Sequence, residues 1–229
     1  AIEAYEKTLQ LDPSKSAVWI ALLSIYENSY DIDPNEWQKK AQEAIDIFNF
    51  TPDFYKSKYK AEYRLGAFNS MIESCDAGLA ILIDDEREKA IFQLDKIFAL
   101  GALGKIKEAT ALAQQVFQTK KTETSALIVQ NLLWLSVYFH FSLPEIEVDV
   151  AQEIKNDKSS RYFKNAYHIQ QGNSIQVDDF NKTEFYDALM AHQYFAKKNE
   201  LATSCIYLQL LKENLKWNQW IKQLQTACP

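Results

Sequence analysis

The sequence predicts an all-α protein, and three observations point to it. Only 5 Gly and 5 Pro occur in 229 residues, too few for the frequent turns of a β sandwich or barrel. Hydrophobic residues make up 47% of the chain, enough to bury a sizeable core. Apolar side chains recur every three or four positions along most of the chain, which is the period of a packed helix. We expect about 11 to 13 helices in all.

The charge balance narrows the range of partners. The net charge is -6 and the isoelectric point is about 5.2, so the diffuse positive field that nucleic-acid binders use is missing. No stretch approaches the run of about 18 apolar residues that spans a bilayer, so we expect no membrane insertion. The sequence has no P-loop, nucleophile elbow or dinucleotide-binding glycine motif. We therefore expect no nucleic-acid partner, no cofactor and no catalytic activity.

Three helices are predicted in the first fifty residues. Residues 1–11 form the first, and Asp12-Pro13-Ser14 ends it because proline cannot continue the hydrogen-bond ladder. Ser16 is expected to cap the second helix. The third begins at Pro34, where the missing N–H costs nothing, and ends at Thr51-Pro52-Asp53. The apolar positions of the first two helices are Ile2, Tyr5, Leu9, Trp19, Leu22, Leu23 and Tyr26.

A pair of helices joined by a short turn is then repeated. Leu65-Gly66-Ala67-Phe68 and Leu103-Gly104-Lys105-Ile106 are similar turns, 38 residues apart. Glycine in each turn can take the left-handed conformation that ends a helix. Small residues in the helix that follows let two backbones approach closely, and an aromatic ring fills the gap. The matching positions are Met71, Cys75 and Gly78 after the first turn and Ala109, Ala113 and Val116 after the second.

These features resemble the tetratricopeptide repeat (TPR), a family of α-helical repeat proteins. Residues 1–13 are similar to the second helix of its unit, with small, aromatic and small residues in order and a closing proline. The helix with Trp19 is similar to the first helix of the next unit, although Leu23 stands where the family has glycine. The resemblance implies a right-handed superhelical solenoid of antiparallel helix pairs. It covers residues 1–120 and starts at the second helix of a unit, so we expect a larger parent protein.

Beyond residue 120 the resemblance weakens, and we expect degenerate repeats over 121–229, continuous with the first part. Residues 123–140 are almost entirely apolar, which predicts a helix buried on several sides. Residues 145–150 alternate like a strand, but their neighbours are helical, so both structures stay open with helix favoured. Further helices are predicted near 160–171, 183–197 and 201–214, followed by a C-terminal capping helix from Asn214.

The cysteines and histidines show no site pattern. Cys75, Cys205 and Cys228 are an odd number without C-x-x-C spacing or a nearby histidine. We therefore predict thiols rather than a disulfide framework or a zinc site, and hence a reducing, cytoplasmic compartment. The three histidines stand on different predicted helices with no carboxylate or cysteine at ligand spacing, so we expect no metal.

Lys56, Lys60 and Arg64 are the main candidates for partner binding. Their spacing of four places them along one cationic ridge of a helix. In the resemblance, the two lysines face the concave groove, where some family members clamp the carboxylate of a chaperone C-terminus. That full clamp is absent, because the next unit has Asp95 at a position that would need a basic residue. We expect either a groove for an acidic segment or a solvated charged face, helped by Glu62.

Two sets of aromatic residues could serve the core or a partner. Tyr55, Tyr59 and Tyr63 form a row beside the lysines, and such a row is predicted to hold one helix on its neighbour. Trp217 and Trp220 on the last helix could form an exposed hot spot for a partner. The favoured alternative is that they cap the last layer of the core.

Together, these predictions favour a non-catalytic protein–protein interaction scaffold that binds a peptide or partner segment in a concave helical groove. One alternative is a regulatory or dimerisation module of a bacterial signalling protein, such as a repeat region attached to a receiver domain. A second is an enzyme on a degenerate solenoid, against which stands the lack of any acid, base or nucleophile constellation. The apolar face of residues 1–11 has no preceding helix to cover it, so we also expect self-association through this helix, or its mobility.

Overall fold

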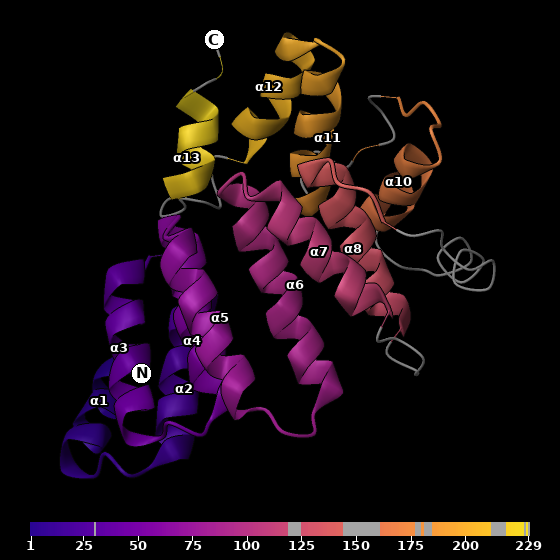
Figure 1. The fold of residues 1–229 in the computed structure, drawn as a ribbon. Helices are drawn as coiled ribbons and strands as arrows, with labels where there is room; N and C mark the ends of the chain where they lie inside the picture. The colour runs from indigo at the N-terminus through magenta and orange to yellow at the C-terminus, as the bar shows by residue number, and fades with distance from the viewer. Residues whose placement is uncertain are drawn as a thin grey trace. The chain divides into compact units, whose positions relative to one another are not determined.

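The computed structural model describes residues 1–29, 31–118, 125–143, 161–176, 180, 185–211, 219–226 and 228. These residues contain twelve α-helices and no strand, which confirms the all-α class (Figure 1). The chain divides into two compact units, Ala1–Phe92 with Asn214–Trp220 and Gln93–Glu213 with Ile221–Pro229. The expected repeat boundary at 120 and the ambiguous segment 145–150 lie outside the described residues.

The helices of the first unit are α1 (Ile2–Leu11), α2 (Ser16–Asn28), α3 (Pro34–Ile47), α4 (Pro52–Leu65), α5 (Phe68–Ile81) and the beginning of α6 (Glu86–Ala102). From α1 to α5, each helix packs against the next along the chain. In addition, α2 packs against α4, so two alternate helices are neighbours as well. The predicted elements of this part are therefore present, with ends within a few residues of those expected.

The helix ends follow the local chemistry of the sequence, with one correction. Pro34 is the first residue of α3, as predicted, and the side chain of Asp33 accepts a hydrogen bond from the N–H of Asn35 at 2.9 Å. The predicted Ser16 cap is wrong, because α2 has Lys15 at its N-cap and no side-chain cap bond. Ser16 cannot serve as the cap because it is already the first residue of the helix.

Where the structure describes it, the second unit contains the rest of α6 and six further helices: α7 (Ile106–Gln118), α8 (Ser125–Phe139), α10 (Arg161–Gln170), α11 (Phe185–Lys197), α12 (Leu201–Leu210) and most of α13 (Gln219–Thr226). Helix α8 packs against α7, α10 and α11, which confirms the prediction of a helix buried on several sides. Its Trp134 stacks on Tyr138 with ring centroids 5.0 Å apart. Helices α11 and α12 form an antiparallel-type pair joined by a three-residue turn, Lys198 to Glu200.

Three of the turns between helices, those after α4, α6 and α11, share one backbone conformation. Gly66 and Gly104 have φ angles of 70° and 73°, which confirms the predicted left-handed ends of α4 and α6. In both turns the residue after the glycine donates its N–H to the carbonyl five positions earlier, at 2.9 Å. Asn199 after α11 has φ 60° and the same backward bond, although the sequence has no glycine there. Asparagine tolerates this conformation better than most residues, so it serves the same purpose.

A close contact between helices explains the small residue at position 78. A Cβ atom built on Gly78 of α5 would lie 2.2 Å from a ring atom of Phe92 on α6. The Phe92 ring is 0% exposed and meets the Tyr59 ring edge-on, with centroids 5.4 Å apart. The ring therefore fills the space that the missing side chain leaves and cannot move aside easily.

Replacing Gly78 with alanine should destabilise the first unit by about 1 to 3 kcal/mol, because overpacking outweighs the better helix propensity of alanine. Chemical denaturation measures this change. Asn69→Ala is the control, since it changes an exposed position of the same helix. A second substitution, Phe92→Leu, should recover part of the loss in the Gly78→Ala background. A Gly78→Ala variant as stable as the natural chain would contradict the close approach of α5 and α6.

Candidate functional site

The two lysines of the predicted ridge lie on α4, and each is bound to another helix of the first unit. Lys56 Nζ is 2.9 Å from Glu88 Oε2 of α6 and 2.7 Å from Asp53 Oδ1. Lys60 pairs with Glu27, near the end of α2. Partial burial opposes the charge of Lys56, but its bonds to Asp53 and Glu88 outweigh burial and raise the pKa of its ammonium.

Arg64, the third residue of the ridge, connects α4 to the end of α2 by hydrogen bonds. Its guanidinium donates hydrogen bonds to the backbone carbonyls of Glu27 and Ser29. The same group lies 4.9 Å above the centre of the Trp37 ring, in cation–π geometry. Arg64 therefore takes up backbone carbonyls that α2 leaves without helical partners.

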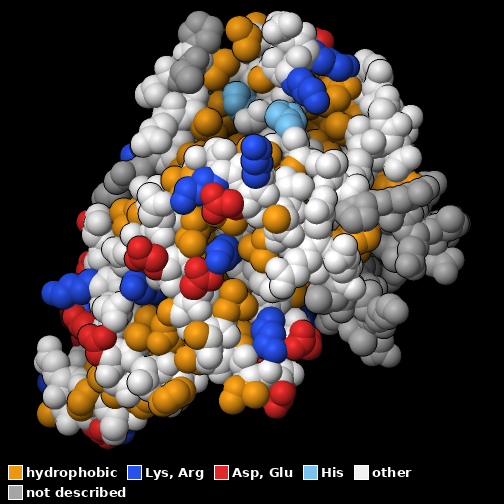
Figure 2. All heavy atoms as spheres, viewed as in Figure 1, with side chains coloured by type: hydrophobic (Ala, Val, Ile, Leu, Met, Phe, Trp, Pro, Cys, Tyr) orange, Lys and Arg blue, Asp and Glu red, His pale blue; other side chains and the backbone are white. Residues whose placement is uncertain are grey.

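The structure thus brings the three cations together along one face and supplies each with a partner from the same unit. Figure 2 shows positive and negative side chains interspersed on the face in view, not segregated into one basic field. An acidic segment bound at this ridge would have to displace Glu27 and Glu88 from Lys60 and Lys56. Binding there would be an exchange of ion pairs, and such exchanges at half-exposed sites gain little free energy.

The aromatic row beside the ridge belongs largely to the core, as predicted. Tyr59 is 1% exposed, and Tyr55 and Tyr63 are half-buried. Trp217 lies outside the described residues. Trp220 is 7% exposed and packs edge-on against Phe68, with centroids 5.9 Å apart. This tryptophan fills the core of the first unit and is not presented to a partner, so the exposed hot spot expected at Trp220 is not what the structure shows.

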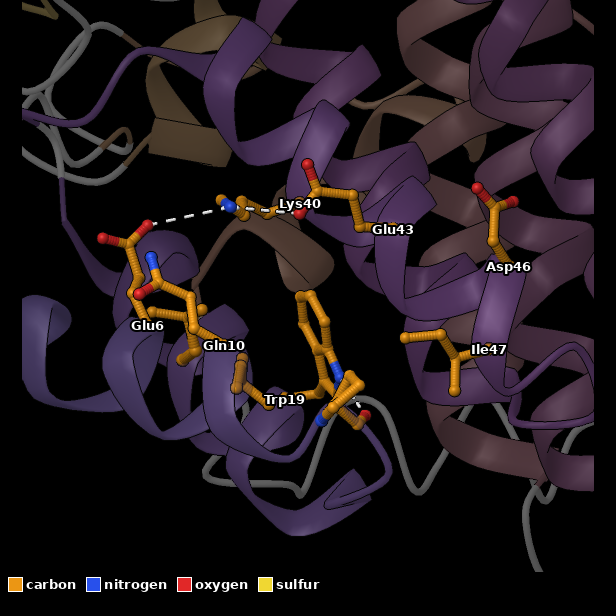
Figure 3. A pocket seen from close by; sticks show the side chains of 10 residues that line it. Glu6, Gln10, Trp19, Lys40, Glu43, Asp46 and Ile47 are labelled. Atoms are coloured by element: carbon orange, nitrogen blue, oxygen red, sulfur yellow. Dashed lines mark hydrogen bonds and ion pairs between the residues drawn. The ribbon is translucent and has the colours of Figure 1, made fainter.

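A groove between α1 and α3, with α2 beneath it, is the one hollow in the described residues that we consider as a site. Its volume is about 410 Å³ (Figure 3). The indole of Trp19 stands in the middle, between Glu6 and Gln10 of α1 and Asp46 and Ile47 of α3. The lining residues are Glu6, Leu9, Gln10, Pro13, Trp19, Leu22, Lys40, Glu43, Asp46 and Ile47.

The two ends of this groove differ in chemistry. At one end, Lys40 Nζ lies 3.8 Å from Glu6 Oε1 and 3.0 Å from Glu43 Oε2, so it bridges the two walls (Figure 3). In the middle, the Trp19 indole N–H donates to the carbonyl of Pro13 at 3.0 Å, so its nitrogen is already bonded and the ring lines the floor. At the other end, Ile47 is 44% exposed and lies beside Asp46. One end is therefore purely charged, and the other combines an apolar side chain with a carboxylate.

Carboxylates dominate the field at the charged end. Tyr26 of α2, which is 1% exposed, donates its hydroxyl to Glu36 Oε1 at 2.9 Å. Burial raises the pKa of Tyr26 strongly, and the charges of Glu36, Glu6 and Glu43 raise it further. Glu6 and Glu43, which line the groove, therefore also act on this buried hydroxyl.

Glu62 is a buried carboxyl that sequence reasoning placed on the surface. The expectation that it would help to solvate a charged face is wrong, because its side chain is 0% exposed between α3, α4 and α5. Oε1 accepts a hydrogen bond from Gln38 at 2.9 Å, while Oε2 and Ser74 Oγ have no hydrogen-bond partner among the described atoms. Burial raises the pKa of Glu62, although the hydrogen bond from Gln38 and the charge of Lys58 favour the charged form.

The cysteine prediction needs correction. Cys205 of α12 and Cys228 after α13 form a disulfide, with Cα atoms 5.6 Å apart, and Cys75 is a buried thiol. Helix α13 returns along α12, where Gln225 Nε2 donates to the carbonyl of Leu208 at 2.7 Å, and this brings the two cysteines together. Sequence spacing could not reveal the pairing because it depends on that return. The expectation of a reducing compartment depended on free thiols, so the disulfide removes the reason for it.

One serine–histidine contact in the second unit resembles a nucleophile and its base, but its position gives it a structural role. Ser204 Oγ is 2.7 Å from His192 Nδ1 and donates to the His192 carbonyl at 2.9 Å. Ser204 is 0% exposed, so no substrate reaches its hydroxyl. Burial lowers the pKa of His192. The pair fastens α12 to α11, and no group of three potential metal ligands occurs in the described part of the chain.

Comparisons with known proteins gave no match to a family model, a curated protein or a solved structure. Among the helices described, none has both the length and the apolar character required to cross a membrane.

Sequence reasoning missed the groove, the buried Glu62 and the disulfide. Trp19 was expected on an apolar stripe, and it is indeed 4% exposed. Nothing in the spacing of residues showed that α1 and α3 leave a gap above it. Glu43 stands three residues before Asp46 and four before Ile47 in α3, and this spacing is the signal that could have pointed to a mixed acidic and apolar face.

Glu62→Gln should make the first unit more stable at neutral pH. The folded chain holds the Glu62 proton more tightly than the unfolded chain, so this carboxyl favours folding below its ordinary pKa near 4.3 and loses that contribution as the pH rises. A neutral amide keeps the bond to Gln38 and avoids the buried charge. Urea denaturation at pH 7 and near pH 4 measures the difference between the two chains, which should shrink at the lower pH. A variant that is less stable than the natural chain at pH 7 would show that the charged form is well accommodated.

Proposed function

We propose that this chain is a non-catalytic scaffold of the tetratricopeptide type, in which stacked helix pairs form a solenoid that binds a segment of a partner protein. The observation that carries the proposal is the groove over Trp19, because side chains of three successive helices converge on it. Short turns with left-handed ends and side-by-side packing of α2 and α4 support the repeat arrangement.

The distribution of polar groups supports binding rather than catalysis. Among the described residues, the Ser204–His192 pair joins two helices, and Lys56 and Lys60 form ion pairs with carboxylates of other helices. These groups therefore serve structural contacts. The groove over Trp19 instead combines an aromatic floor with charges at one end, which is the composition of a recognition site.

The proposal is tested by capture of partners with the full chain, followed by mass spectrometry. If an acidic segment binds at the ridge of α4, then Lys56→Glu/Lys60→Glu should lose the partner, and added salt should weaken the capture. Because charge reversal places new carboxylates beside Glu27 and Glu88, the neutral variant Lys56→Gln/Lys60→Gln is measured in parallel, and thermal melting verifies that each chain is folded.

The matched control is Lys105→Glu/Lys107→Glu, which makes the same charge change at exposed positions in and before α7. Equal capture by all four chains would remove the ridge as the binding site. If the folded chain retains only the proteins that a heat-unfolded sample also retains, the scaffold function itself is contradicted.

A further inference from the structure

The groove between α1 and α3 has a chemistry that selects one class of partner segment. Its charged lining residues are three carboxylates, Glu6, Glu43 and Asp46, and one ammonium, Lys40. Lys40 is shared by Glu6 and Glu43, so the rim retains a surplus of negative charge. Asp46, on the exposed side of α3, accepts only a neutral amide hydrogen bond, from Gln42 at 2.7 Å.

At the end formed by Ile47, the groove offers exposed hydrophobic surface next to these charges. Ile47, which lines the groove, is 44% exposed and directly follows Asp46. Two more large hydrophobic side chains lie close in the chain to lining residues, Leu11 at the end of α1 with 81% exposure and Phe50 after α3 with 80%. Exposed apolar surface beside a hollow, here that of Ile47, is typical of a contact surface.

The size of the hollow limits what it can hold. A volume of about 410 Å³ is at the lower end of the range of ligand pockets, about 300 to 1,000 Å³. It accepts one or two side chains of a bound segment, with the rest of that segment lying along the rim. The floor is preformed, because the Trp19 indole is fixed by its bond to Pro13, so little ordering of the protein is needed on binding.

The charge of the groove excludes several other occupants. A second copy of this chain, with a net charge of -6, would meet like charge at the rim, and nucleic acids and anionic membrane surfaces would be repelled in the same way. A segment with lysine or arginine beside a bulky apolar residue complements both the carboxylates and the apolar lining of the groove. Its cation would pair with Asp46 or with the carboxylates that share Lys40, and its apolar side chain would lie on Trp19 and Ile47.

We propose that the groove between α1 and α3 binds a basic, apolar-anchored peptide segment of a partner protein, with Asp46 as the principal charge contact and Ile47 and Trp19 as the apolar contact. This inference rests on the proposed scaffold function and names the partner chemistry of one surface. It also places basic partners at a different surface from the acidic segment expected at Lys56, Lys60 and Arg64.

The test uses the full chain and three fluorescein-labelled peptides of nine residues. The first has two central leucines flanked by lysines and arginines, the second has glutamates at the flanks, and the third keeps the basic flanks but replaces the leucines with serines. Fluorescence anisotropy at low and at physiological salt gives the affinities. The first peptide should bind at least about tenfold more tightly than either of the others at low salt, and salt should weaken its binding.

Variants of exposed residues locate the site without disturbing the core. Asp46→Asn and Ile47→Ser should each weaken binding of the first peptide about threefold or more. The matched controls are Asp84→Asn and Ile83→Ser, which make the same changes at exposed positions before α6 and should leave binding unchanged.

Three results would overturn the inference: equal affinity for the basic and the acidic peptide, equal affinity for the leucine and the serine peptide, or equal losses in the control variants. A chain that still captures a partner protein specifically but shows any of these results would refute the inference and leave the scaffold function standing. If no partner is captured but the first peptide binds as described, the groove chemistry is supported and the scaffold function is not.

Discussion

The structure of the first unit depends on how closely its helices approach one another. Three alanines, Ala41, Ala44 and Ala61, are 0% exposed in its core, and a side chain at Gly78 would collide with Phe92. Because small residues occupy these crossings, large rings fill the spaces beside them, and Trp37 is only 1% exposed. Dense interdigitation of this kind fixes the helix spacing and, with it, the distance over which side chains on different helices can pair.

The same spacing has consequences for polar groups. Helix α4 approaches its neighbours closely enough for Lys60 and Arg64 to reach the end of α2 and for Lys56 to reach α6. It also encloses Glu62, whose second carboxyl oxygen has no hydrogen-bond partner among the described atoms. At the start of the chain, by contrast, α1 and α3 are held apart over α2, and the groove over Trp19 remains open. The spacing between helices therefore accounts both for the ion pairs around α4, where the helices are close, and for the groove beside α1, where they are further apart.

Much of the fold could be predicted from the sequence, because its signals are local. Proline at Pro34, glycine at Gly66 and Gly104, and the apolar period of α8 each act within a few residues, and the structure agrees with all of them. The site was harder, because a groove, a buried carboxyl and a disulfide depend on which helices meet. The spacing of Lys56 and Lys60 predicted a common face correctly, but it could not show that Glu88 and Glu27 of other helices would neutralise them. Long-range pairing decides such contacts, and the spacing of residues along the chain does not show it.

Amide hydrogen exchange of the full chain, read helix by helix, tests the packing account most directly. If close crossings hold the first unit together, the central amides of α2 and α4 should exchange slowest and at similar rates, since both helices are covered by neighbours. Amides of α1, whose Ile2 and Tyr5 are only half-buried, should exchange roughly tenfold faster or more. Two results would contradict the claim that these contacts hold the first unit together. One is exchange of the α4 amides as fast as that of the α1 amides, and the other is clearly different exchange rates for α2 and α4.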